Sequence, residues 1–133
     1  MSTRIPITKP FFDIDEEKAV LDPIRSGWVV QGPKVAEFEK RVAAHAGVAH
    51  GIATTSCTTS LHLALIAANV GPGDEVIMPS FTWVSTANMV EYVGAKPVFC
   101  DIDIDTFNID PKQIASLITP KTKAILAVHL FGL

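Results

Sequence analysis

Residues 54–65 read Thr-Thr-Ser-Cys-Thr-Thr-Ser-Leu-His-Leu-Ala-Leu, and they pass directly from a run of hydroxyl side chains into an apolar helical pattern. Just before them, Val48, Ile52 and Ala53 read as a short strand. A strand, a small-residue turn and a helix together present the first, unpaired N–H groups of the helix and the positive end of its dipole to an anion. Serine and threonine are also ordinary helix caps, but six hydroxyl residues within Thr54–Ser60 are more than one cap requires. The stretch therefore predicts an anion-binding site.

Length and composition narrow the class of protein. A chain of 133 residues with 48% hydrophobic residues can form one globular domain. The formal net charge of −3, without a run of Lys or Arg, argues against nucleic acid as a partner. No apolar run approaches the ~20 residues of a membrane span, so we expect no membrane partner. Two cysteines, Cys57 and Cys100, fit reduced thiols in the cytoplasm better than a disulfide framework.

Alternating strands and helices predict an α/β fold. Besides the strand before Thr54, three apolar runs read as strands, at 75–78, 97–100 and 123–128. Helical patterns occupy 13–25, 33–46, 61–68, 83–93 and a segment that begins at 110. Continuous apolar strands that alternate with helices are typical of a parallel sheet with helices on both faces. The helix at 61–68 is apolar nearly all round, which predicts burial on more than one side.

The first part of the chain reads as an extended arm to Phe12, a helix and a loop. We expect Pro23 to kink or shorten the helix, because its ring clashes with the preceding turn. The loop 27–33 carries Trp28 between two glycines, so this indole either covers the edge of the core or lines a site. In the next helix, we expect one buried stripe and a wet side that includes Glu39; the stripe consists of Val35, Phe38, Val42 and Ala46.

Ligands of open parallel sheets bind beyond the carboxyl ends of the strands. Four strand ends therefore contribute to one rim: the hydroxyl loop, the segment 79–83, Asp101 with Asp103, and His129. Trp83 alone would be expected to pack between helix and sheet. Combined with the anion loop, it predicts an indole that stacks on a flat ring whose phosphate lies in the loop.

Other candidates for chemistry at this rim are weaker. None of the lysines is placed to attack a carbonyl there. Cys57 could act as a nucleophile at a helix N-terminus, but no base is evident beside it. Asp101, Asp103 and Asp105 have a spacing like that of metal ligands, yet the segment lacks the glycine and later glutamate of a calcium loop. A solvated turn is the better interpretation, and we predict no metal site.

A series of motifs carries a family resemblance. In chain order these are Ser26-Gly27-Trp28, Gly32-Pro33-Lys34-Val35, the segment 58–65, Gly73-Asp74-Glu75-Val76-Ile77, Pro79-Ser80-Phe81-Thr82-Trp83, Gly94-Ala95-Lys96-Pro97-Val98-Phe99 and Val128-His129-Leu130-Phe131-Gly132. The chain thereby resembles the N-terminal third of the DegT/DnrJ/StrS family of pyridoxal-phosphate-dependent sugar aminotransferases. The resemblance implies the large domain of the aspartate aminotransferase type (fold type I), with 1–33 as arm, helix and active-site loop and 34–133 as an incomplete cofactor-binding domain.

The same resemblance implies site residues and partners. Thr58 and Thr59 match the pair that binds the phosphate of pyridoxal 5'-phosphate, Trp83 matches the aromatic residue that stacks on its ring, and the segment 28–31 lies near the active site. Cys57 stands where glycine or alanine is common. Family members are homodimers with the active site at the subunit interface. The Schiff-base lysine and the aspartate that pairs with the pyridine nitrogen lie beyond Leu133, so we expect no catalytic residue in this chain and no turnover by it alone.

The implied reaction is transfer of an amino group from an amino acid, commonly glutamate, to a keto sugar carried on a nucleotide. Two alternatives remain open. Some family members dehydrate the sugar ring instead. A non-catalytic phosphate- or nucleotide-binding α/β module is the second, although the first turn lacks the glycine-rich dinucleotide fingerprint and Trp83 would have no purpose in it. Because the chain ends directly after its most apolar predicted strand, we also expect it to be the N-terminal part of a longer protein.

Overall fold

The computed structural model describes residue 6 and residues 8–133, and the chain divides into two compact units between Ala53 and Thr54. The predicted arm lies partly outside the described residues. Each unit is described separately. From the family resemblance we predicted a different boundary, after residue 33, between the active-site loop and the cofactor-binding domain. That boundary stays a prediction.

The described part of the first unit contains two helices. Helix α1 (Ile14–Ser26) begins with a reciprocal cap, in which the Asp15 amide donates to the Asp13 carboxylate at 2.9 Å and the Asp13 amide donates to Glu16 at 2.8 Å. It ends at Gly27, whose φ of 72° suits glycine. Pro23 was expected to kink or shorten α1; the shortening is wrong, because the helix continues past Pro23 to Ser26.

Helix α2 (Pro33–Ala46) begins at a proline, as predicted, but its expected buried stripe is wrong. Phe38 is 59% exposed and Val42 is 45% exposed, whereas Ala43 is buried. The apolar pattern is present in the sequence, but the described part of the first unit offers no surface that covers it. An amphipathic helix buries its apolar face only when another element packs against that face.

The strand predicted at Val48–Ala53 does not form, and this stretch is a loop. The Ala53 amide donates to Oε1 of Glu39 at 2.8 Å instead of to a neighbouring strand. A Cβ atom at Gly51 would lie 2.7 Å from the Glu39 carbonyl oxygen, so the loop approaches the helix closely. Glu39 was expected on the wet side of α2 and is instead half-buried beneath this loop.

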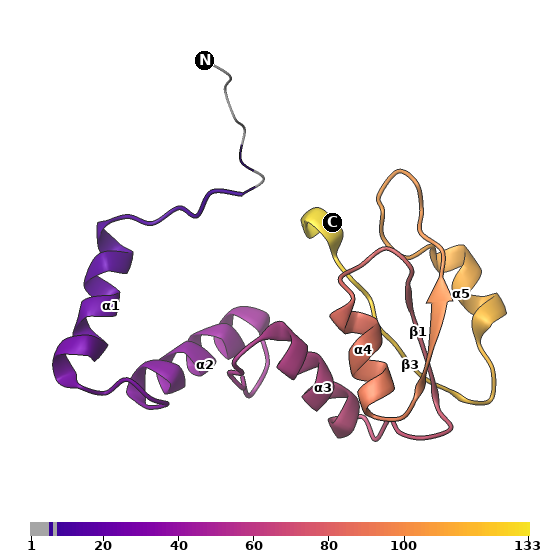
Figure 1. Ribbon diagram of the computed structural model, residues 1–133, viewed down its shortest axis with the longest axis horizontal. Helices are drawn as coiled ribbons and strands as arrows, with labels where there is room; N and C mark the ends of the chain where they lie inside the picture. The colour runs from indigo at the N-terminus through magenta and orange to yellow at the C-terminus, as the bar shows by residue number, and fades with distance from the viewer. Residues whose placement is uncertain (1–5, 7) are drawn as a thin grey trace, which may run out of the picture. The chain divides into compact units, whose positions relative to one another are not determined.

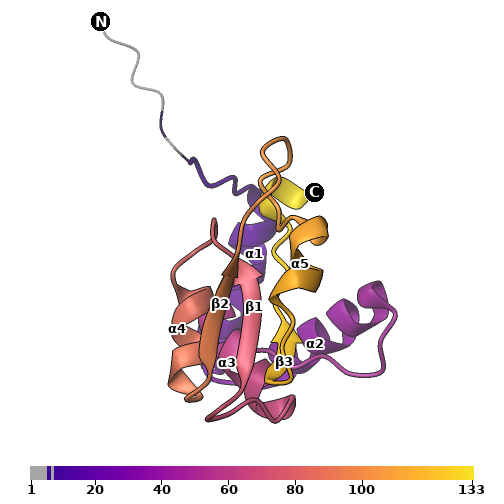
Figure 2. The same cartoon turned by 90° about the vertical axis from the view of Figure 1, so that its right-hand side faces the viewer.

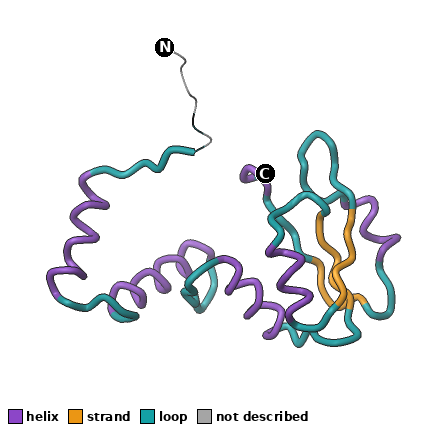
Figure 3. Tube along the Cα trace, viewed as in Figure 1, coloured by secondary structure: helices purple, strands orange, loops and turns teal. Residues whose placement is uncertain are grey.

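The second unit is an α/β layer arrangement (Figures 1 and 3). Its elements, in chain order, are α3 (Cys57–Ala67), β1 (Glu75–Pro79), α4 (Ser85–Tyr92), β2 (Lys96–Cys100), α5 (Pro111–Leu117), β3 (Thr122–Ile125) and the single 3-10 turn η1 (Leu130–Gly132). The strands form one sheet in the order β2-β1-β3, and both pairs are parallel. Figures 1 and 2 show α4 on one face of the sheet and α5 on the other. The predicted fold class is confirmed, with three strands in place of four.

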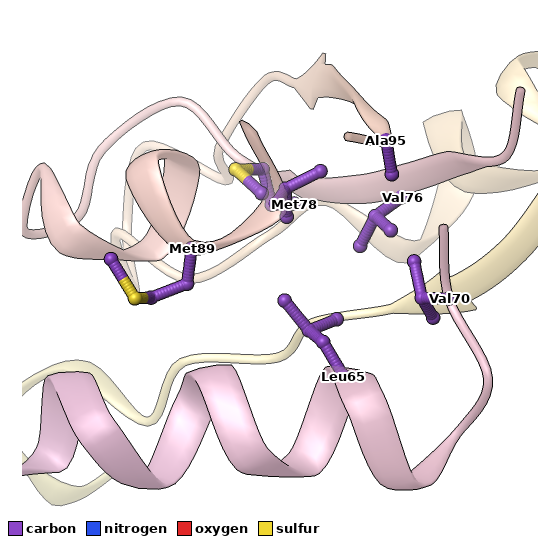
Figure 4. Packing of buried hydrophobic residues seen from close by; sticks show 7 residues of the cluster. Leu65, Val70, Val76, Met78, Met89 and Ala95 are labelled. Atoms are coloured by element: carbon purple, nitrogen blue, oxygen red, sulfur yellow. The ribbon is translucent and has the colours of Figure 1, made fainter. Parts of the chain in front are cut away.

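The core lies between this sheet and the helices α3 and α4 (Figure 4). It joins Leu65 of α3, Val76 and Met78 of β1, and Met89 of α4. Alternate residues of β1 point to opposite faces, and the whole strand is buried. Burial of α3 on several sides is wrong for this chain, because Leu63 and Ile66 are 46% and 52% exposed.

The buried carboxylate of Glu75, the first residue of β1, joins the start of that strand to the loop before β3. Oε2 of Glu75 accepts a hydrogen bond from the Thr119 hydroxyl at 2.6 Å, and Oε1 lies 3.3 Å from Nζ of Lys96. The Thr119 hydroxyl, followed by the Lys96 ammonium, holds the pKa of Glu75 below its ordinary value. The pairing of β1 with β3 changes register between Glu75 and Val76. This cluster therefore fixes the start of β3.

Among the described residues, every helix is too short or too polar to cross a lipid bilayer.

Candidate cofactor site

The hydroxyl run forms the start of α3 and is partly used to cap it. Ser56 is the N-cap residue, and its hydroxyl accepts the Thr59 amide at 3.2 Å. Oγ1 of Thr59 lies 3.1 Å from Oγ of Ser56 and 3.3 Å from Oγ1 of Thr55. Oγ1 of Thr54 lies 2.6 Å from Oγ of Ser60. Five of the six hydroxyls are thus engaged with one another or with the backbone, so capping explains more of the run than expected.

Three donors at this helix start have no hydrogen-bond partner in the described part of the chain: the amides of Cys57 and Thr58 and the hydroxyl of Thr58. The amides of Thr59 and Ser60 are both taken by Ser56. Because the first amides of a helix carry partial positive charge, the remaining donors face a position that suits an anion. Thr58 and Thr59 therefore differ: the Thr58 hydroxyl has no partner among the described residues, whereas the amide and the hydroxyl of Thr59 both contact the cap residue Ser56.

Trp83 lies in the turn before α4, not in the helix as predicted. Its carbonyl accepts the Thr86 amide at 3.0 Å, and Oγ1 of Thr82 lies 3.2 Å from Oγ1 of Thr86, so the turn is tied to the helix on both sides of the indole. The side chain of Trp83 is 77% exposed. It does not pack between helix and sheet, which was the alternative to a ring-stacking role.

A cavity of about 430 Å³ brings the two sequence-predicted features together. Thr58 and Leu61 line it from α3, Trp83 lines it from the turn before α4, and the segment 126–128 lines it after β3. Pockets for small ligands and cofactors are typically about 300–1,000 Å³ and mostly apolar, with few polar groups. The arrangement can hold a flat ring against an indole and an anion at a helix start. Thr59 does not line the cavity.

The other candidates for the rim lie outside this cavity. The carboxylate of Asp103 accepts the amides of Asp105 and Thr106, each at 3.0 Å, which agrees with the predicted turn. Asp101 accepts the Ile102 amide at 2.8 Å. Nδ1 of His129 lies 2.8 Å from the carbonyl oxygen of Leu133. No cluster of three or more potential metal ligands occurs within the described residues.

Sequence reasoning missed the apolar wall formed by Leu126, Ala127 and Val128. The signal was available, because these residues follow the third observed strand at its carboxyl end, where ligands of parallel sheets bind. They were instead predicted to continue the strand, which ends at Ile125. Cys57 also lines the cavity.

Trp28, which was expected either to cover the core or to line a site, lines a separate cavity of about 330 Å³ within the first unit. Its indole N–H donates to the Gln31 carbonyl at 3.1 Å. A Cβ atom at Gly32 would lie 2.0 Å from Nε1 of Trp28, so only glycine fits beneath this ring.

Comparison with known proteins gives this geometry a context. UDP-4-amino-4-deoxy-L-arabinose–oxoglutarate aminotransferase of Shewanella sediminis is 47% identical over 128 residues, which are 96% of this chain and 33% of that protein. GDP-perosamine synthase of Caulobacter vibrioides is 48% identical over 130 residues, 97% of this chain and 35% of that protein. The chain thus spans about a third of the length of these relatives.

Solved structures similar to this chain also include a sugar aminotransferase. A putative sugar aminotransferase of Streptococcus pneumoniae in its PMP form superposes with a TM-score of 0.89 at 39% identity, over 96% of this chain and 32% of that one. The profile of the DegT/DnrJ/EryC1/StrS aminotransferases matches residues 11–133. By sequence and by fold, the chain belongs to the DegT/DnrJ/EryC1/StrS aminotransferase family.

Proposed function

We propose that the protein containing these residues is a pyridoxal-phosphate-dependent aminotransferase that moves an amino group from glutamate to a keto sugar carried on a nucleotide. Membership of the family supports amino transfer. Two relatives have names that include a nucleotide and an amino sugar, and the name of one includes oxoglutarate, the keto acid left when glutamate gives up its amino group. These names favour amino transfer over dehydration of the sugar ring.

The observation that carries the proposal is the cavity that Thr58 and Trp83 both line. Its donors suit the cofactor: two unpaired amides and one free hydroxyl for a phosphate, an exposed indole for an aromatic ring, and an apolar wall from Leu126 to Val128. Hydrogen bonds to a charged oxygen are stronger than neutral ones. The donor set therefore fits the phosphate of pyridoxal phosphate, and no lysine or arginine is among the residues that line the cavity.

In this proposal, the residues of this chain bind and orient the cofactor. The Thr58 hydroxyl and the amides of Cys57 and Thr58 hold the phosphate, and Thr59 acts through the cap that keeps those amides in place. Trp83 covers one face of the ring and excludes water from it. Bound there, pyridoxal phosphate would supply the electron sink that amino transfer needs.

We propose that the remaining catalytic groups are supplied by residues outside this chain. Since the chain covers about a third of its relatives, we assign the Schiff-base lysine and the aspartate partner of the ring nitrogen to residues beyond Leu133. We also propose a homodimer with the active site at the subunit interface, as the family resemblance implies. The two free cysteines, Cys57 and Cys100, support a cytoplasmic location.

Binding of pyridoxal phosphate to the full-length protein tests this function. We expect the purified protein to show cofactor absorbance and to release the cofactor on dialysis against a competing amine. Trp83→Ala should weaken binding by about tenfold, because stacking of a nucleobase on an aromatic side chain contributes ~1–3 kcal/mol and the pyridine ring is a similar flat ring. Tyr92→Ala is the matched control, since Tyr92 is 72% exposed and does not line the cavity.

The two threonines sharpen the test. Thr58→Val should weaken cofactor binding by roughly tenfold or more, because a hydrogen bond to a charged group contributes ~1.5–3 kcal/mol. Thr59→Val should act mainly through the helix cap and therefore cost less affinity. A wild-type protein that binds no pyridoxal phosphate would overturn the proposed function, and unchanged affinity in Trp83→Ala would remove the stacking role.

A further inference from the structure

The loop between β2 and α5 is a closed hairpin made of Asp101–Asp110. Ile102 and Ile109 form an antiparallel bridge, and the Asp103 amide donates to the Asn108 carbonyl at 2.9 Å. The Asp103 carboxylate caps the turn by accepting the amides of Asp105 and Thr106. Figure 2 shows this hairpin at the end of the sheet toward which β1 and β2 point, the same end as the C-terminal turn. The hairpin is thus ordered by its own hydrogen bonds.

One contact of the hairpin reaches the turn that carries Trp83. The rings of Phe107 and Phe81 lie 5.8 Å apart at 46°. Phe107 has a φ of 59°, a left-handed conformation that a bulky side chain rarely adopts. Such strain persists only where the surroundings hold it in place. The strained backbone turns the Phe107 ring toward the segment just before Trp83.

A second contact reaches the opposite wall of the cavity. Oδ1 of Asn108 accepts the Leu130 amide at 2.9 Å, and this bond is partly buried. The last ladder bond of β3 is donated by the Leu126 amide to Ile77. After Leu126, the next hydrogen bond that links the chain to another element of the described second unit is the bond from the Leu130 amide to Asn108. The wall 126–128 therefore lies between two fixed points.

We propose that the hairpin braces the two walls of the cavity and that Asn108 is a positioning residue for cofactor binding. Neither Asn108 nor Phe107 lines the cavity, so both act through Leu130 and Phe81. A purely local role for Asn108 is disfavoured, because Asp103 and Thr106 already cap the turn while the Asn108 side chain points to a segment 22 residues away. The identity of the ligand rests on the proposed function. The brace, by which we mean the contacts of Asn108 with Leu130 and of Phe107 with Phe81, rests on geometry alone.

The test uses the full-length protein and three variants. Asn108→Ala removes the acceptor and should weaken binding of pyridoxal phosphate by roughly five- to tenfold, the effect of one lost hydrogen bond. Asn108→Asp keeps an oxygen at the same place and should bind within about twofold of the wild type. Asn88→Ala, at an exposed position of α4 outside the cavity, should leave affinity unchanged. Absorbance titration of the cofactor-free protein measures all four affinities.

Hydrogen exchange without cofactor provides the independent measurement. In Asn108→Ala, the amide of Leu130 should exchange roughly tenfold faster than in the wild type or in Asn108→Asp. Equal cofactor affinity in Asn108→Ala and the wild type, or failure of Asn108→Asp to restore it, would overturn the positioning role. Unchanged exchange at Leu130 would overturn the brace itself.

The two proposals can fail separately. If the wild type binds no pyridoxal phosphate while exchange at Leu130 still depends on Asn108, the cofactor assignment is wrong and the brace stands. If Asn108→Ala does not fold, Asn108→Ser replaces it, because the shorter hydroxyl does not reach the Leu130 amide.

Discussion

The two units of this chain have similar helices but very different interiors. In the second unit, Val76, Ile77, Met78 and Val90 are fully buried and Leu65 is 2% exposed. Among the described hydrophobic residues of the first unit, only Ala43 is buried. Both units have capped helices with apolar patterns. The difference lies in what each helix can pack against.

Parallel strands account for that difference. They pair residues far apart in sequence, and together they present a surface that α3 and α4 cover. The described part of the first unit has two helices and connecting loops, so its apolar side chains, such as Phe38, stay exposed. Caps and periodicity are enough to form a helix end and a helix face, but packing against a partner surface supplies most helical stability.

The largest expected effect tests this contrast directly. Leu65→Ala should lower the free energy of unfolding of the second unit by about 2–5 kcal/mol, as for other buried leucines. Leu21→Ala is the matched change in the first unit, where Leu21 is 39% exposed, and it should cost less than ~1 kcal/mol. Urea unfolding followed by circular dichroism measures both. Equal losses would mean that the two units do not differ in core packing.

A smaller effect compares the helix caps. Ser56→Ala and Asp13→Ala should each cost ~1 kcal/mol locally. In the second unit this loss should appear in the unfolding transition, since α3 is part of the core. In the first unit it should appear as faster hydrogen exchange in α1, which has no buried residue. A loss of global stability from Asp13→Ala comparable with that from Ser56→Ala would contradict the contrast.

The smallest expected effect concerns the stability of the fold at acid pH. The pKa of Glu75 in the folded protein is lowered from 4.5, chiefly by the Thr119 hydroxyl and then by Lys96. Folding therefore favours the charged form, and the resulting stability is present above the ordinary pKa and is lost as pH falls through the lowered value. Glu75→Gln should flatten the dependence of unfolding on pH below about pH 4.5. Thr119→Val should flatten it as well, whereas an unchanged slope in both variants would exclude this carboxylate as a source of acid lability.

Much of the second unit could be predicted because its signals are local. The Gly-Pro-Gly turn at 71–73, the apolar runs of β1 and β2, and the Asp110-Pro111 helix start each occupy a few adjacent residues. The predictions that failed depend on distant partners. The strand expected at Val48–Ala53 has no paired strand among the described residues, and the Ala53 amide donates to Glu39 instead.

The candidate site shows the same division. Residue type and position relative to the strands suggested Trp83 and the hydroxyl run, and the family resemblance singled out Thr58 and Thr59 within that run. Trp83 and Thr58 line the cavity. The sequence could not separate the role of Thr58 from that of Thr59. Their difference depends on which of the two hydroxyls contacts the cap residue Ser56, and in the structure it is that of Thr59. The apolar wall after Ile125 was also missed, since it depends on where β3 stops pairing with β1.

By itself, the sequence determined the class of fold, the helix caps, the hydroxyl-rich start of α3 and the aromatic residue before α4, because these follow from local propensity and periodicity. Only the tertiary structure decided which apolar faces are buried, which hydroxyl stays free and which segments meet at the cavity. Those outcomes depend on pairs such as Asn108 with Leu130 and Glu75 with Thr119. Such contacts form only when the parallel sheet brings distant segments together.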